Sequence, residues 1–467
     1  MKKTLYQRLL ALALIAFTVV PFWSCNKDEH NELTFTSPAL YFSNFGSTQS
    51  IAYRSTNVGS VRVSEVPEGW SAEIDTKAKI VTITAPVSLE EKDDVTPKSN
   101  GILKLTGYGA DDEVVIAQLY VALTDVVDYT SNPSNCYVIN RPNIGYMLSA
   151  THVPQSNLQI DAESVEVLWT TSTKIIQYLD LTSEGTISFM VAADESGKLI
   201  EGNVLLGVFD TKGNLAWTFH LWISDLDLSK DVVAFNGKEF IARNLGAMNN
   251  TTATQDEILR SYGLYYQWGR PTPFAGPKYY NCASADSASM YDGDGVVAKV
   301  ETVDAQSQQW SLEEAIVNPL EFVTNLSSWD ITKPWSDDEK SMYDPCPEGW
   351  RVPQSGTFDG VSILEADLNE GIDALCERYG WHLTDGANSE FFFAGGRRTY
   401  LDGKIVNMNT EETPKPWVGF YWTCGEVSSL AESLFFDLNT TNISESALQS
   451  ERQVQLSNGL QIRCVRE

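Results

Sequence analysis

The sequence predicts a multidomain protein in which two all-β sandwich domains precede one α+β domain. Three observations support this fold class. The chain has 467 residues, more than one ordinary hydrophobic core accommodates. Strand-like alternation of apolar and polar residues recurs from residue 33 to about residue 230. Helical patterns appear only after residue 310, between long segments rich in Gly, Pro and Trp.

The amino terminus has the pattern of an export signal. Lys2, Lys3 and Arg8 precede the apolar run "LLALALIAFTVV", which is shorter than the ~20 residues of a membrane-spanning helix. The run ends at "PFWSC", where a small residue stands before Cys25 as in a bacterial lipoprotein signal. The following "NKDEH" resembles the short acidic export signal of Bacteroidota surface lipoproteins.

We therefore predict a lipoprotein signal peptide over residues 1–25 and a lipid on Cys25. The alternative is an ordinary secreted protein cleaved near Ser24. The resemblance implies an outer-membrane protein that is lipid-anchored and exposed at the cell surface. Contact with the membrane is then expected through the lipid anchor only.

The charge balance excludes one class of partner. The chain carries 33 basic and 62 acidic residues, a formal net charge of −29. Such a surface repels nucleic acid and anionic lipid, so we expect no nucleic-acid partner. Solubility is the simplest reason for the acidity.

Residues 26–127 are predicted to form the first β-sandwich. Strand patterns are "IVTITAP" (80–86), "GILKLTG" (101–107) and "EVVIAQLYVAL" (113–123), with Trp70 as a core residue. The segments around them resemble the small Ig-like modules of Bacteroidota surface lipoproteins, including the BACON family. That resemblance implies a spacer, with glycan binding as the alternative.

Residues 128–232 are predicted to form the second β-domain, a meander with Gly-containing turns at 194–198 and 210–214. "NCYVIN…GYM" and "LAWTFHLWISD" resemble a recurrent β-domain of fimbrillin-like surface proteins. His220 lies between aromatic residues on a predicted strand. We expect it to be a hydrogen-bonded structural residue rather than a catalytic one.

Residues 233–467 are predicted to form the α+β domain. "SLEEAIVNPLEF" (311–322) begins with a Ser N-cap followed by two glutamates, and "NEGIDALCERYG" (369–380) has one apolar face and ends at a glycine. The remainder consists of short strands and long irregular loops.

Five motifs of this last unit, in order, resemble the Fibrobacter succinogenes major paralogous domain, a family related to the C-type-lectin-like fold. The motifs are "FNGKEFIARNLGA", "YGLYYQWGRPTPF", "DPCPEGWRVP", "FFFAGGRRTYLDGK" and "VGFYWTCGE", before the terminal "LQIRCVRE". "FFFAGGRR" departs from the family's usual apolar-Pro-Ala-Ala-Gly-Tyr-Arg run but keeps the small residues and the arginine. The resemblance implies that the ends of the domain pair and that a loop region on one side carries ligand sites.

Six of the seven cysteines remain if Cys25 is lipidated, and an exported chain permits disulfides. The fold resemblance places Cys464, on the closing strand, near Cys346, so a Cys346–Cys464 disulfide is the preferred pairing. The alternative is a catalytic pair of Cys346 and Cys424, since the wider fold includes formylglycine-generating oxidases. Asp344 and Glu348 flank Cys346 with negative charge, which disfavours a reactive thiolate.

Tryptophans are the candidate ligand-binding residues. Trp329 and Trp335 lie in the polar loop "LSSWDITKPWSDDEK", so an exposed ring of either would suit a sugar. Packing beneath the loop is the alternative for both. "YDGDG" (291–295) is the one plausible calcium loop, although a simple turn is favoured. We predict no metal site, no cofactor and no catalytic residue.

The sequence thus predicts a non-catalytic cell-surface lipoprotein for adhesion or ligand binding, as an accessory or tip component of a fimbria. The alternative is a glycan-binding lipoprotein of a polysaccharide capture system. Expected partners are a glycan or a host or cell-surface protein, with fimbrial subunits as further candidates. An enzyme is disfavoured because no phosphate loop, nucleophile elbow or histidine cluster occurs.

Overall fold

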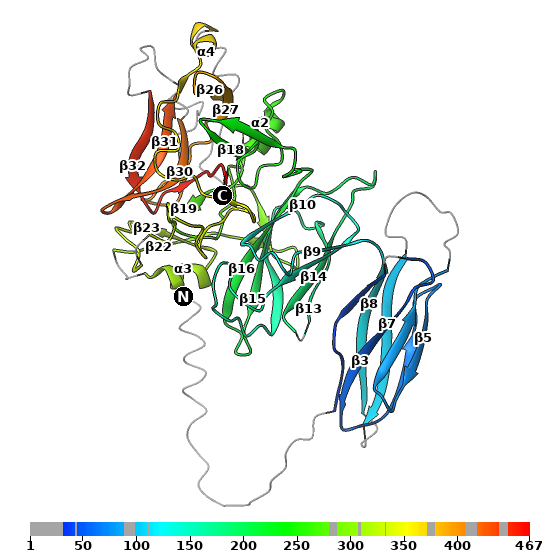
Figure 1. The fold of residues 1–467 in the computed structure, drawn as a ribbon. Coiled ribbons are helices and arrows are strands. Elements are labelled where there is room, and N and C mark those ends of the chain that lie inside the picture. The colour runs from blue at the N-terminus through cyan, green and yellow to red at the C-terminus, as the bar shows by residue number, and fades with distance from the viewer. Residues whose placement is uncertain are drawn as a thin grey trace, which may run out of the picture.

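A computed structural model shows a chain built mostly of β-strands, as predicted (Figure 1). It describes residues 31–42, 44–87, 99–109, 113–182, 184–279, 287–306, 310–331, 333–370, 379–406, 418–438 and 447–467. The predicted signal peptide and the lipidation site Cys25 lie outside these residues.

The first unit is a sandwich of two four-stranded sheets, drawn in blue and cyan in Figure 1. One sheet has the order β1 (Glu32–Phe35), β3 (Thr48–Thr56), β6 (Ile80–Thr84) and β5 (Ser71–Asp75). The other has the order β2 (Ala39–Phe42), β8 (Val114–Leu123), β7 (Ser99–Gly109) and β4 (Val58–Glu65). Alternate residues of both sheets enclose a separate core, in which the ring of Trp70 lies 5.0 Å from that of Phe42.

The second unit has a six-stranded and a four-stranded sheet. The larger has the order β10 (Cys136–Ile139), β16 (Leu215–Ile223), β15 (Gly202–Phe209), β12 (Ser164–Thr170), β20 (Met290–Tyr291) and β21 (Val297–Ala298). The smaller has the order β13 (Ile176–Leu181), β14 (Thr186–Val191), β11 (Gly145–Ser149) and β9 (Val126–Asp128). The β20–β21 hairpin therefore extends a sheet whose other strands all precede residue 224.

The third unit is made of small sheets. β17 (Val232–Phe235) and β18 (Lys238–Ile241) join β34 (Val465–Arg466) and β24 (Trp350–Arg351), so its two ends pair. The other sheets are β19 (Tyr266–Gln267), β33 (Gly459–Leu460), β28 (Arg397–Arg398) and β29 (Ile405–Val406); β22 (Glu301–Asp304) and β23 (Glu321–Thr324); β25 (Ser362–Ile363), β26 (Gly380–Thr384) and β27 (Ser389–Phe393); and β30 (Val418–Val427), β31 (Leu430–Asp437) and β32 (Leu448–Gln455).

Helices are few and short among the described residues: α2 (Gln255–Ser261), α3 (Leu312–Val317) and α4 (Glu365–Glu370). None of them is long and apolar enough to span a bilayer. α3 begins at the predicted cap, where Ser311 and Glu314 form a capping box. It ends before Pro319, which cannot continue a helix, so residues 321–322 belong to β23 rather than to the predicted helix. The other predicted helix, 369–380, falls mainly outside the described residues. The lectin-like class of this unit stays a prediction.

The second and third units share one core. A single hydrophobic cluster includes buried residues of both, from Cys136 to Cys464. A line of polar contacts, which we call the seam, joins the same two units. In the seam, Asn135 Nδ2 donates to the carbonyl oxygens of Met342 and Asp344 (both 2.8 Å), Ser134 Oγ to that of Cys346 (3.2 Å), Asn203 Nδ2 to that of Gly246 (2.9 Å) and Trp222 Nε1 to that of Ala247 (2.8 Å). The change of sequence pattern at residue 232 therefore does not mark a break in the core.

The first and second units meet at a smaller aromatic joint. The ring of Tyr120 stacks on that of Tyr178 at 4.3 Å, and Tyr120 Oη donates to Met190 Sδ (3.0 Å). Tyr41 packs against the edge of Tyr120. The joint thus holds the first sandwich with a cluster separate from either domain core.

Candidate functional site

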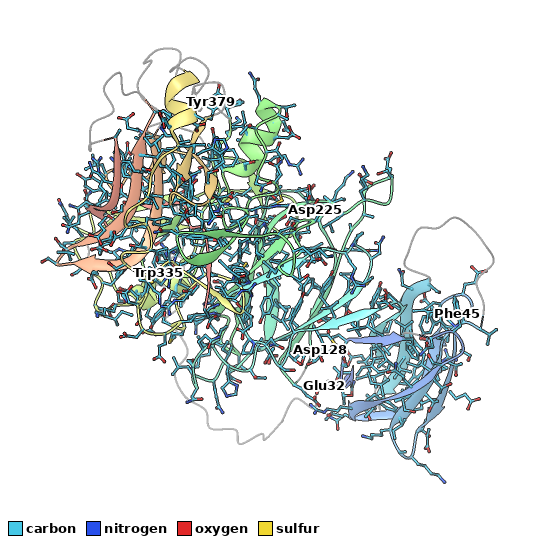
Figure 2. The ribbon with its side chains drawn as sticks, turned by 45° about the horizontal axis from the view of Figure 1, so that its top comes forward. Glu32, Phe45, Asp128, Asp225, Trp335 and Tyr379 are labelled. Atoms are coloured by element: carbon cyan, nitrogen blue, oxygen red, sulfur yellow. A yellow bond between two sulfur atoms is a disulfide. The ribbon has the colours of Figure 1, made fainter. Side chains whose placement is uncertain are left out.

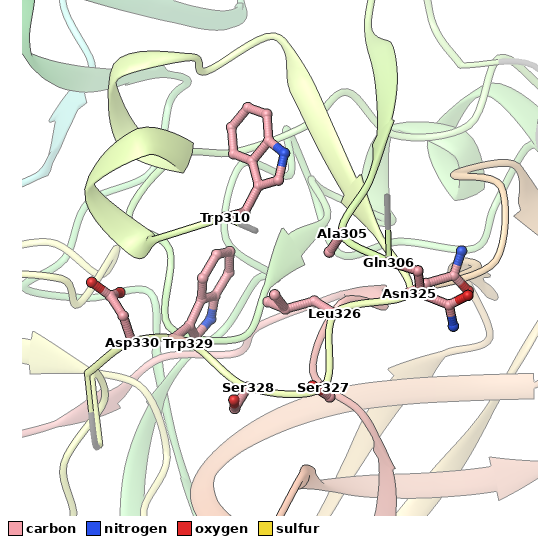
Figure 3. Close-up of a pocket in the computed structure, with 9 residues that line it drawn as sticks. All are labelled: Ala305, Gln306, Trp310, Asn325, Leu326, Ser327, Ser328, Trp329 and Asp330. Atoms are coloured by element: carbon pink, nitrogen blue, oxygen red, sulfur yellow. The ribbon is translucent and has the colours of Figure 1, made fainter. Parts of the chain in front are cut away.

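A hollow of about 380 Å³ lies beside the loop that follows β23 (Figure 3). We call it the tryptophan hollow. Its lining mixes indole rings with amide, hydroxyl and carboxylate groups: Ala305, Gln306, Trp310, Asn325, Leu326, Ser327, Ser328, Trp329 and Asp330. Its volume is within the range of pockets that hold small molecules.

The hollow forms where two parallel strands end together. β22 and β23 pair in register from Glu301↔Glu321 to Asp304↔Thr324, so the chain leaves both strands at the same edge. Asn325 then adopts a left-handed conformation (φ 54°), which asparagine tolerates better than most residues. This turn directs residues 326–330 across the opening. Trp310, just before the cap of α3, lies on the same side of the hollow as Trp329 (Figure 3).

Trp329 is at the hollow, and most of its ring is buried. Trp329 and Trp310 are each 7% exposed, so ring edges rather than open faces border the space. Trp329 Nε1 donates to the carbonyl oxygen of Trp268 (2.7 Å), which fixes the orientation of its ring. Trp310 was not singled out in the sequence, although it too lies among polar residues, in "QSQQWSLEE".

Trp335 does not border the hollow. It is 1% exposed, its ring lies 5.9 Å from that of Trp268, and its Nε1 donates to the carbonyl oxygen of Tyr343 (2.9 Å). Figure 2 shows it among the side chains of the third unit. The alternative of packing beneath the loop therefore describes Trp335, because burial and a satisfied indole N–H leave it no open face. Of the two tryptophans, Trp329 therefore remains the ligand-binding candidate.

The hollow is rich in hydrogen-bond acceptors. Asp330 Oδ1 accepts from the backbone N–H of Leu312 (2.9 Å) at the start of α3, while Oδ2 accepts from no described residue. Asn325 Nδ2 donates to Asp304 Oδ1 (3.2 Å), which leaves the side-chain oxygen of Asn325, Oδ1, to accept from another donor. Among the lining residues that the structure describes, none is a lysine or an arginine. The site therefore has negative electrostatic character.

The segment "DPCPEGWRVP" is a closed structural element. Cys346 and Cys464 form a disulfide (S–S 2.06 Å) that ties it to the closing strand. Asp344 is buried: its Oδ1 accepts from the backbone N–H of Cys346 and its Oδ2 from that of Val352 (both 2.9 Å). Burial raises the pKa of Asp344, and the nearby Lys340 ammonium opposes that rise.

Lys340 satisfies the carbonyl groups of the same segment. Its side chain is 3% exposed. Its Nζ donates to the carbonyl oxygens of Cys346 (2.9 Å), Pro347 (2.6 Å) and Trp350 (2.5 Å). A buried ammonium is tolerated only when its donors are met, and here three are. Sequence reasoning missed this residue, since a lysine in an acidic loop gives no sign of burial.

Cys424 lies close to this segment but lacks the setting of a nucleophile. Its Sγ contacts the carbonyl oxygen of Val352 (3.5 Å), and burial raises the pKa of its thiol. Its presumed catalytic partner, Cys346, is held in the disulfide. A reactive cysteine needs a stabilised thiolate, so the geometry favours the structural interpretation of both residues.

The segment "YDGDG" forms the turn of the β20–β21 hairpin. Asp292 Oδ1 accepts from the backbone N–H groups of Asp294 (3.0 Å) and Val296 (2.8 Å). This is an ordinary Asx-type turn. Within the described ranges, no cluster of three or more metal-ligating side chains occurs.

His220 belongs to the seam. Its Nε2 lies 2.9 Å from Asn203 Oδ1, the amide whose nitrogen bonds Gly246. Burial lowers the pKa of His220 to about 3, so the ring is neutral at pH 7. It matches the expected hydrogen-bonded structural histidine.

Comparison with known proteins gives no family. No family model matches the chain, and no curated protein matches its sequence. Among solved structures, SGBP-B of the Bacteroides ovatus mixed-linkage glucan utilization locus, in complex with a heptasaccharide, has 13% identity and a TM-score of 0.12, covering 40% of this chain and 43% of its own. SporoSAG from Toxoplasma gondii has 9% identity and a TM-score of 0.14, covering 41% of this chain and 97% of its own. The D00–D0 domain of intimin has 10% identity and a TM-score of 0.17, covering 41% of this chain and 96% of its own. This chain thus spans less than half the length of the Bacteroides ovatus structure. Similarity at such TM-scores does not indicate function.

Proposed function

We propose that this chain is a non-catalytic cell-surface binding protein, with the tryptophan hollow as its ligand site and the β-sandwich units as its support. The observation that carries the proposal is the composition of the hollow. The indole rings and Leu326 adjoin oxygens of Asp330 and Asn325 that accept from no residue the structure describes, a combination that suits a ligand with both apolar and hydroxyl surfaces. Among the residues that the structure describes, the free thiols of Cys136 and Cys424 and the ring of His220 are buried, and none of the three has the setting of a reactive group.

Adhesion and glycan capture are the two roles consistent with this site. Adhesion, as an accessory or tip component of a fimbria, is supported by the row of β-units and by the joint that fixes the first to the second. Glycan capture is supported by the acceptor-rich hollow. The two differ in the ligand: a surface-bound protein or glycoconjugate in the first, a soluble polysaccharide in the second.

The proposal includes a lipid anchor on Cys25 and exposure at the outer surface, both inferred from the signal pattern. Labelling cells with a clickable palmitate should mark the wild-type protein. A Cys25→Ser variant should lose the label. Retention of the label in that variant would contradict the anchor without affecting the ligand site.

The direct test fills the hollow without touching the core. Trp329→Ala is unsuitable because removing a buried indole costs about 3–5 kcal/mol and confuses misfolding with lost binding. Ser328 is exposed and lines the hollow, so Ser328→Tyr obstructs it while leaving the fold intact. Ser60→Tyr, at an exposed position of β4, is the matched control.

The 26–467 protein and both variants are applied to glycan arrays and to arrays of cell-surface proteins. We expect saturable binding of at least one ligand by the wild type and by Ser60→Tyr, and its loss in Ser328→Tyr. Binding that survives Ser328→Tyr would place the ligand site elsewhere and contradict the proposal.

A further inference from the structure

We propose that the tryptophan hollow selects a neutral saccharide, which it binds through the sugar's hydroxyl donors, and rejects acidic sugars. This inference rests on the proposed function and adds the class of ligand. It is carried by three features of the hollow: its acceptors, its charge and its shape.

The acceptors require a ligand that donates. Asp330 Oδ1 is occupied by the N–H of Leu312, which holds the carboxylate in place, and Oδ2 remains for a ligand. Asn325 is fixed through its amide nitrogen by Asp304, so its oxygen is the atom available. Sugar hydroxyls donate to such fixed oxygens, and a hydrogen bond to a carboxylate is stronger than one between neutral groups.

The charge disfavours an anion. Asp330 lines the hollow, Asp304 lies just behind Asn325, and no lining residue that the structure describes carries a positive charge. A uronate or sialate carboxylate would enter without a partner, close to a fixed negative charge. The net charge of −29 adds a repulsion of the same sign at long range.

The site is a hollow rather than a flat surface, and its shape suits one or two sugar units. Figure 3 shows Trp310 and Trp329 on one side of the hollow, Ala305 and Asn325 on the other, and Leu326 between them. The indole edges and Leu326 supply apolar contact for C–H groups of a sugar, and the exposed Ser327 and Ser328 supply hydroxyl groups at the rim.

The experiment measures the affinity of the 26–467 protein for matched pairs of oligosaccharides. Neutral glucan, galactan and mannan oligosaccharides are each compared with the same chain oxidised at C6 to the uronate. Isothermal titration calorimetry gives the affinities of the wild type, Ser328→Tyr and Asp330→Asn. The asparagine keeps an oxygen for the N–H of Leu312, so the fold should be retained, and thermal unfolding of each variant checks this.

We expect at least one neutral member to bind and its oxidised partner to bind at least tenfold more weakly. Asp330→Asn should weaken binding of the neutral oligosaccharide about tenfold or more. It should also reduce the difference in affinity between that oligosaccharide and its oxidised partner. Ser328→Tyr should abolish binding of both.

Equal or tighter binding of the oxidised members would overturn the inference, as would an unchanged affinity in Asp330→Asn. Preference for a protonated amino sugar over every neutral one would also overturn it. In each of these cases, loss of binding in Ser328→Tyr would still support the hollow as the ligand site. If no saccharide binds, the inference fails, and the proposed function is then tested by the protein arrays alone.

Discussion

The seam and the tryptophan hollow both combine buried indoles with polar side chains, yet they use them in opposite ways. In the seam, Asn135, Asn203 and Trp222 each donate to a backbone carbonyl of the third unit. Beside it, Lys340 and Asp344 satisfy the loop of Cys346. In the hollow, Asp330 and Asn325 use one polar atom each to hold their position. Polar groups that are fully paired within the chain stabilise it, whereas fixed groups with an atom to spare can bind something else.

The largest expected effect concerns the shared core behind the seam. A fragment of residues 233–467 should fail to unfold cooperatively, because it exposes the part of the hydrophobic cluster that the second unit covers. A fragment of residues 126–467, which retains both units, should show one cooperative transition. Circular dichroism during urea denaturation compares them. A cooperative transition in the shorter fragment would show that the two units do not depend on each other.

Removal of the Lys340 ammonium should destabilise the loop of Cys346, beside the seam, without changing the hollow. Lys340→Met removes the donor shared by three carbonyl oxygens, of which those of Cys346 and Pro347 keep a second donor in Ser134 Oγ and the N–H of Trp350. We expect a loss of about 1–3 kcal/mol in the free energy of unfolding. Lys77→Met, at an exposed turn position, should change it by less than ~0.5 kcal/mol. Equal stability of the two variants in urea would contradict the role given to Lys340.

His220 should make the seam sensitive to acid. Its pKa falls from 6.5 to about 3 on folding, so between these values the unfolded chain binds a proton that the folded chain does not. The resulting stability is complete above pH 6.5 and is lost as the pH falls towards 3, by about 1.4 kcal/mol per pH unit. His220→Gln lacks this titration, so the difference in the free energy of unfolding between the wild type and the variant should change with pH by this slope. Parallel stability curves over that range would contradict it.

The smallest effect separates Trp335 from the tryptophan hollow. Trp335→Phe removes an indole N–H that bonds Tyr343, and should cost about 1–3 kcal/mol of stability while leaving ligand affinity unchanged. Ser328→Tyr should abolish ligand binding while leaving the stability unchanged. Reduced affinity in a folded Trp335→Phe protein would extend the binding site beyond the hollow.

Local patterns in the sequence predicted local features. The alternation in residues 80–86 and 113–123 predicts strands that are found, Trp70 lies in the first core, and Ser311 caps α3. Such local patterns do not predict contacts between segments that are distant in the sequence. The β20–β21 hairpin pairs with β12 across more than a hundred residues, and Lys340 is buried only because a neighbouring loop turns its carbonyls inward. The Cys346–Cys464 pairing came from the fold resemblance, which supplied long-range information.

For the hollow, the sequence indicated the correct loop but not which of its tryptophans borders a space. Both lie among polar residues, and exposure depends on what packs against them. Trp310 and Asp330 contribute because two parallel strands end together, a juxtaposition that spacing alone does not show.

If the hollow, and not another surface, binds the ligand, obstructing it must abolish binding. The most direct measurement is a calorimetric titration of the 26–467 protein, its Ser328→Tyr variant and its Ser60→Tyr variant with the tightest ligand found on the arrays. We expect unchanged thermal unfolding in all three proteins, full binding by the wild type and Ser60→Tyr, and no binding by Ser328→Tyr. Undiminished binding by a folded Ser328→Tyr protein would contradict it.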